Sequence, residues 1–157
     1  MDLLLNFPLL AALSSIIIAQ AIKVPIRLVV TKEFIPSLAF STGGMPSSHS
    51  AAVAALTTAI GITDGTTSTT FAAAFVFSVI IMFDASGVRR QAGEQAIVLN
   101  KLIKDFQYFV DGAKGWSKKE EYEKRQELKE LLGHKPIEVF FGAVTGVGIA
   151  FLLHQLY

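Results

Sequence analysis

The sequence contains no cysteine and few charged residues. Without cysteine, a disulfide scaffold, a thiol nucleophile and a thiolate metal site are all excluded. Charged residues make up 17% of the 157 residues, against roughly 25% in soluble domains, whereas 52% are hydrophobic. The 14 basic and 13 acidic residues do not give the basic excess expected of a nucleic-acid-binding protein. We therefore expect a single membrane domain over residues 1–157, with part of its surface in lipid.

Four long segments carry little or no charge and are suited to cross a bilayer. A bilayer core needs about 20 apolar residues in a helix, with a range of roughly 17–25. The segments predict an all-α polytopic membrane helical bundle with four spanning helices, near residues 3–22, 47–63, 66–84 and 137–156. The first segment is not expected to be a signal peptide, because it starts at Asp2 without a basic region and is followed by Lys23.

All 14 lysine and arginine residues fall on one side of this arrangement, in the loops 23–46 and 84–136. The positive-inside rule then places both loops in the cytoplasm and both termini outside, in an integral cell-membrane protein. The second loop contains a cytoplasmic helical insertion over residues 85–135. Apolar residues recur there at steps of four and three, which predicts an amphipathic helix: Ala92, Ala96, Leu99, Ile103, Phe106 and Val110. A capping box at Ser117 opens a charged helix over 118–132, so we expect a helical hairpin that lies on the bundle or pairs with another copy.

Polar residues gather at the cytoplasmic ends of the predicted spans. The string Gly43-Gly44-Met45-Pro46-Ser47-Ser48-His49-Ser50 leads into the second span. Glycines followed by a helix N-terminus offer backbone N–H groups to phosphate-like anions. Ser47 and Ser48 add hydroxyl donors, and His49 can gain or lose a proton near neutral pH. The alternative is a plain helix N-cap with a histidine at the level of the lipid headgroups.

Two pairs of cations lie near the same boundary. Lys23 and Arg27 are four residues apart, so they share a face if the first helix continues past the membrane interface. Arg89 and Arg90 could form a guanidinium clamp on an oxyanion, with one arginine of the pair in contact because adjacent helical residues do not share a face. The alternative is that these cations are snorkelling anchors and topology signals.

His134 and Glu138 open the last span and lie four residues apart, on one helical face. The carboxylate can accept the imidazole N–H, fix its tautomer and make the other nitrogen a better nucleophile or base. The alternative is a glutamate favoured by the helix dipole, with His134 as an incidental cap. The clusters together match phosphoryl transfer, where catalysis is mostly positioning and charge stabilisation. The Gly142-x-x-x-Gly146 spacing predicts close helix packing, and His154 is expected to be structural.

The order of these residues resembles the type 2 phosphatidic acid phosphatase (PAP2) superfamily, which also includes vanadium haloperoxidases. The layout of residues 44–51, 84–90 and 133–139 is similar to the divergent branch of this superfamily, whose members are small bacterial and plant membrane proteins. The resemblance implies His134 as the nucleophile, Glu138 as the acid that orients it, and His49 as the proton donor to the leaving group. It implies that the phosphate oxygens are held by cations and serines: Lys23, Arg27, Ser47, Ser48, Arg89 and Arg90. It implies no metal and no other cofactor, because lysine and arginine supply the charge.

The function that this resemblance implies is hydrolysis of a phosphate monoester or diphosphate of a lipid through a phosphohistidine intermediate. The substrate is expected to be a phospholipid or an isoprenyl phosphate, cleaved at the cytoplasmic face. Ser48 replaces the usual glycine, Glu138 replaces the usual aspartate, and the whole insertion separates Arg90 from His134. Four spans are fewer than the usual six, so a homodimer could complete the lipid cleft. The alternatives are a non-catalytic binding protein or carrier for anionic lipid headgroups and a scaffold whose hairpin binds a partner.

Overall fold

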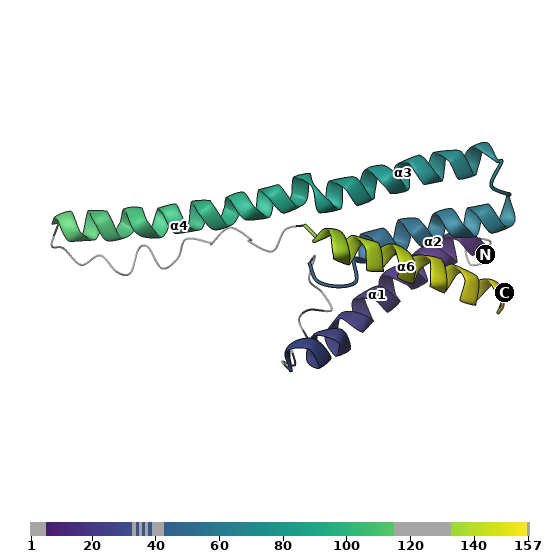
Figure 1. Cartoon of the computed structure of the whole chain (residues 1–157), viewed down its shortest axis with the longest axis horizontal. Helices are drawn as coiled ribbons and strands as arrows, with labels where there is room; N and C mark the ends of the chain where they lie inside the picture. The colour runs from purple at the N-terminus through teal and green to yellow at the C-terminus, as the bar shows by residue number, and fades with distance from the viewer. Residues whose placement is uncertain are drawn as a thin grey trace.

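The computed structural model of the chain describes residues 6–32, 34, 36, 38, 43–114 and 133–156. Its long elements are all helices, in the order α1 (Phe7–Thr31), α2 (Ser48–Thr63), α3 (Thr69–Ser86), α4 (Val88–Lys114) and α6 (Pro136–His154). Helices α1, α2, α3 and α6 form a bundle, and α4 continues the line of α3 away from this bundle (Figure 1). The all-α bundle expected from the sequence is confirmed.

Three helical stretches in the described part of the chain are long and apolar enough to cross a membrane. They are Phe7–Thr31, Thr69–Phe109, which joins α3 to most of α4, and Pro136–His154. The remaining bundle helix, α2, has 16 residues, so it is about 24 Å long at 1.5 Å per residue, against a hydrocarbon core of about 30 Å. A full crossing by α2 therefore stays a prediction.

The first helix is longer than the sequence indicated. Its predicted end at Ile22 rested on Lys23 as the first charge, yet α1 continues to Thr31 and ends where Lys32 takes a left-handed φ of 57°. Pro25 lies inside the helix and has no N–H to donate to the preceding turn. Lys23 does not end the helix, because its side chain is buried in the bundle rather than exposed at the membrane surface.

The central helix of the bundle is α2, which contacts α1, α3 and α6. Its buried face includes small residues that let other backbones approach closely: Ala51, Ala54, Ala55 and Ala59. On α6, a Cβ added at Gly142 would collide with the backbone oxygen of Ser47, and one added at Gly146 would collide with that of Ala51. The close packing predicted from the spacing of these two glycines is therefore confirmed.

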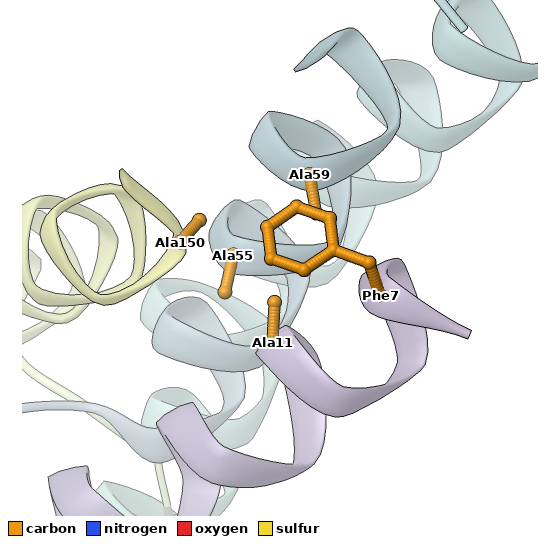
Figure 2. Packing of buried hydrophobic residues seen from close by; sticks show 5 residues of the cluster. All are labelled: Phe7, Ala11, Ala55, Ala59 and Ala150. Atoms are coloured by element: carbon orange, nitrogen blue, oxygen red, sulfur yellow. The ribbon is translucent and has the colours of Figure 1, made fainter. Parts of the chain in front are cut away.

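An apolar core lies where α1 begins and α6 ends. It joins small residues of three helices around one aromatic ring (Figure 2): Phe7, Ala11, Ala55, Ala59 and Ala150. The rings of Phe7 and His154 lie 5.5 Å apart. The start of α1 and the end of α6 are therefore at the same end of the bundle, as is the turn between α2 and α3 (Figure 1).

A small hydrogen-bond network joins α2 to α3 inside the bundle. The hydroxyls of Thr57 and Ser78 are 2.7 Å apart, and the Ser78 hydroxyl donates to the carbonyl of Val53 at 3.0 Å. In apolar surroundings, such bonds hold helices in register where the hydrophobic effect between helices is weak. They fix the position of α3, whose far end reaches the site described below.

The helix α4 is separated from α3 by Gly87 alone and extends beyond the bundle as a rod (Figure 1). It covers residues 92–110, so the amphipathic helix predicted there is confirmed. Most of its large apolar side chains are exposed, among them Leu99, Ile103 and Phe106. Residues 118–132, the predicted second helix of the hairpin, lie outside the described residues.

Candidate active site

Polar side chains of three helices meet at the end of the bundle that lies opposite the chain termini. They come from α1, from the N-terminus of α2 and from the start of α6: Lys23, Ser47, Ser48, His49, His134 and Glu138. Lys23 has no exposed surface and His134 is 3% exposed. Ionisable residues within membrane bundles are costly and mark functional sites, which makes this cluster the candidate site.

His134 and Glu138 form a dyad at the start of α6. The Nδ1 atom of His134 lies 3.1 Å from Oε2 of Glu138. The same carboxylate oxygen accepts the backbone N–H of Lys135 at 3.1 Å, which completes a capping box on α6. The same carboxylate therefore caps the N-terminus of α6 and holds the imidazole. The spacing of four residues predicted the contact with the imidazole.

The other ring nitrogen of His134 is available for chemistry. Its Nε2 atom is buried and has no hydrogen-bond partner among the described residues. In the tautomer that donates from Nδ1 to the carboxylate, Nε2 carries the lone pair. A buried polar atom without a partner is rare in proteins and calls for a functional explanation. An imidazole held in this way can act as a nucleophile or as a base.

His49 lies beside the ring of His134. The centroids of the His49 and His134 rings are 6.1 Å apart, with the planes tilted by 61°. His49 stands on the first turn of α2 and is exposed, whereas His134 is buried. The structure thus brings the two imidazoles, which come from distant parts of the chain, to one face of the bundle.

Lys23 brings a cation to the site from α1. Its ammonium interacts electrostatically with Glu138. Its stem passes Gly44, where an added Cβ would lie 3.9 Å from the lysine Cδ. Gly44 has a φ of 90°, a left-handed conformation that favours glycine. The glycine of the loop before α2 therefore supports the buried stem of the lysine.

Ser47 has the structural role of a helix N-cap, which was the alternative expected for this string. It is the N-cap of α2, and its hydroxyl oxygen accepts from the backbone N–H of Ser50 at 3.4 Å and from the Ser50 hydroxyl at 3.1 Å. Its own N–H donates to the carbonyl of Glu138 at 3.0 Å. This contact ties the start of α2 to the first turn of α6. Ser48, which is also buried, follows it on α2.

The structure describes the side chains of two of the three candidate arginines, Arg27 and Arg90, and both are exposed. Arg27 is exposed on α1, one turn beyond Lys23. Arg90 pairs with Glu94 along α4 at 2.9 Å, with the two side chains 44% and 60% exposed. The side chain of Arg89 lies outside the described residues. As phosphate ligands, all three arginines stay predictions.

A backbone contact that no motif indicated connects α3 to the site. The N–H of His134 donates to the carbonyl of Ala85 at 2.9 Å, in the last turn of α3. The position of the imidazole therefore depends on α3 as well as on α6. Sequence patterns describe side chains, so a carbonyl acceptor of this kind leaves no signal in them.

Among the described residues, no group of three or more His, Asp or Glu side chains could hold a metal ion.

Comparisons with known proteins identify the family of the chain. The chain matches the model of the divergent PAP2 family over residues 4–149. It is 58% identical over 157 residues to the uncharacterized membrane protein YuiD of Bacillus subtilis (strain 168), covering 100% of this chain and 99% of the relative. No solved structure matches the chain. The motifs, the helical membrane architecture and the match over nearly the whole length agree, and the chain belongs to the divergent PAP2 family.

Proposed function

We propose that the protein is a lipid phosphatase that hydrolyses a phosphate monoester or diphosphate of a membrane lipid through a phosphohistidine. One observation carries this proposal. His134 is held through Nδ1 by Glu138 at 3.1 Å, while its buried Nε2 has no partner among the described residues. A nitrogen oriented in this way, whose lone pair no described residue engages, can attack phosphorus.

The reaction proceeds in two displacements. In the first, Nε2 of His134 forms a bond to phosphorus, the bond from phosphorus to the lipid oxygen breaks, and His49 donates a proton to that oxygen. In the second, His49 takes a proton from water, the water oxygen bonds to phosphorus, and the bond from phosphorus to Nε2 breaks. Inorganic phosphate leaves, and both imidazoles return to their first state. An imidazole with an ordinary pKa of about 6.5 can serve both as acid and as base near neutral pH.

The charge of the phosphate requires cations near the reacting atoms. Among the described residues of the site, Lys23 is the buried cation. It supplies a positive charge without a metal ion. Ser48 is the proposed hydroxyl donor, whereas Ser47 caps α2 in the resting site. Arg27, Arg89 and Arg90 are the proposed additional ligands.

The lipid is proposed to enter from the cytoplasmic leaflet. The site lies at the end of the bundle from which the positively charged α4 projects, and such ends face the cytoplasm by the positive-inside rule. Both termini then lie outside. A homodimer is proposed to complete the wall of the lipid cleft.

The second candidate function is a non-catalytic carrier of anionic lipid headgroups. The observation that favours it is the pairing of Arg90 with Glu94 at 2.9 Å, because phosphoryl transfer normally uses several cations at once and this guanidinium already has an acidic partner. A carrier would bind the same headgroups and release no phosphate.

Phosphate release from purified protein in detergent distinguishes these functions. We expect release from at least one class of lipid phosphate, unaffected by a metal chelator and inhibited by vanadate, which imitates phosphate in its transition state. His134→Ala should abolish release, whereas the control His154→Ala, on the same helix at the other end of the bundle, should retain it. Binding without release, or release by His134→Ala at the wild-type rate, would contradict the phosphatase.

A covalent intermediate gives a second, independent readout. Brief incubation with a ³²P-labelled lipid phosphate should label the wild-type protein through a bond that is labile to acid and stable to alkali, as expected of phosphohistidine. His134→Ala should not be labelled. Label that persists in this variant would place the covalent bond elsewhere.

A further inference from the structure

The amide of Gln20 on α1 is a second buried polar group without a hydrogen-bond partner. Its Oε1 atom and Nε2 of His134 share this property among the described residues. Buried polar atoms normally have partners, so each exception suggests a missing ligand or water. The proposed function gives the histidine nitrogen a task and leaves the amide oxygen without one.

The position of Gln20 relates this oxygen to the proposed site. Gln20 precedes Lys23 by three residues on α1, and side chains at this spacing are neighbours on a helix surface. The helix runs from the end with the chain termini towards the site, as the contact between Phe7 and His154 shows. Gln20 therefore lies about one helical turn further along α1 from the end of the bundle that carries the site than Lys23 does.

We propose that Gln20 determines substrate specificity by accepting a hydrogen bond from an O–H or N–H group on the lipid side of the phosphoester. This inference rests on the proposed function and narrows its substrate class. It favours a lipid phosphate with a hydroxyl or amide next to the phosphoester, such as a lysophospholipid or a sphingoid phosphate. An isoprenyl phosphate carries no such donor, because its carbon chain is all hydrocarbon.

The chemistry of the amide oxygen supports this direction of recognition. Oε1 is an acceptor, and ester carbonyls, hydrocarbon chains and ionised phosphate oxygens cannot donate to it. A site with a buried hydrogen-bonding group discriminates against a ligand that lacks the matching group, because the protein atom then stays unpaired. Gln20 would thus discriminate between lipids that share one phosphate headgroup.

The first test compares two substrates that differ in one hydroxyl: a lysophosphatidic acid and its 2-deoxy analogue. Wild-type protein should prefer the hydroxyl lipid by about tenfold in kcat/KM, the value of one hydrogen bond worth about 1.4 kcal/mol. Gln20→Leu should lose this preference because its kcat/KM for the hydroxyl lipid falls, whereas its kcat/KM for the deoxy lipid stays at the wild-type value. The matched control Gln155→Leu changes an exposed glutamine at the opposite end of α6 and should keep the preference.

Other outcomes would overturn the proposal. An equal fall of kcat on both lipids would mean that Gln20 positions the attacking water. Unchanged rates on both lipids would mean that Gln20 has no role in the site.

A binding measurement separates this inference from the failure of catalysis. Dissociation constants of the same two lipids, in detergent micelles, are measured with His134→Ala and with the double variant His134→Ala/Gln20→Leu. A preference of about tenfold that disappears in the double variant supports the role of Gln20 even if no phosphate is released. Equal affinities for both lipids in His134→Ala would overturn it, whatever the catalytic result.

Discussion

The rings of His49 and His134 lie 6.1 Å apart across the contact between α2 and α6. In the proposed reaction the phosphorus atom lies between these two rings. The close packing of Gly142 and Gly146 against the start of α2 brings the elements that carry the two rings together. Most of the predictions below test either the chemistry of this pair or the packing that creates it.

Removal of the negative charge of Glu138 should reduce catalysis without unfolding the protein. Glu138→Gln keeps the shape of the side chain, but its amide can donate to Nδ1 and thereby place the proton on Nε2. We expect kcat to fall by about 10²–10⁴-fold. The control Glu94→Gln, at an exposed carboxylate on α4, should retain the wild-type rate. A Glu138→Gln variant that keeps more than about a third of the wild-type kcat would refute the role of the acid.

Removal of the charge of Lys23 should weaken the binding of phosphate. Lys23→Met keeps most of the apolar stem beside Gly44 and loses the ammonium. The affinity for vanadate should fall at least about tenfold. The thermal stability should fall as well, because the Glu138 carboxylate loses the buried ammonium with which it interacts. The measurements are vanadate inhibition and thermal unfolding in detergent, with Lys101→Met on α4 as the control.

The glycines of α6 should differ in their tolerance of a methyl group. Gly146→Ala places a Cβ against the backbone of Ala51, whereas nothing lies within 4 Å of a Cβ at Gly148. Gly146→Ala should destabilise the bundle by about 1–3 kcal/mol, and Gly148→Ala should stay within about 0.5 kcal/mol of the wild type or stabilise it. Equal unfolding free energies for both variants would show that α6 does not pack on α2 as described.

The proposed orientation in the membrane can be tested with introduced cysteines, because the chain has none of its own. A membrane-impermeant maleimide added to intact cells should label Asp64→Cys in the turn after α2 and Leu156→Cys near the C-terminus. It should label Lys101→Cys on α4 only after the cells are opened. The reverse pattern would place the site on the outer face and contradict entry from the cytoplasmic leaflet.

The positions of most helices could be predicted from the sequence. Charge-free runs predicted the positions of α2, α3 and α6, because a bilayer admits few structures besides long apolar helices. The end of α1 was not predicted, because a lysine in a sequence is normally taken as exposed, whereas Lys23 is buried among other helices. Burial of that kind depends on neighbours that are distant in the chain.

The site was predictable where it is local and less so where it depends on packing. Four residues of spacing were enough to predict the contact between His134 and Glu138, because both lie within one helical turn. The carbonyl of Ala85 and the support of Lys23 by Gly44 depend on how separate helices meet, so spacing does not show them. The exposed pairing of Arg90 follows from the direction of α4, which leaves the bundle after Gly87.

The enclosure of α2 by its three neighbours also bears on how the protein enters the membrane. A helix of 16 residues with a face of alanines is a poor substrate for insertion by itself. The turn that follows it is short, and α3 is strongly apolar. We therefore expect the translocation machinery to receive α2 and α3 together as a helical hairpin. The chain is then assembled around a helix that the bilayer alone would not retain.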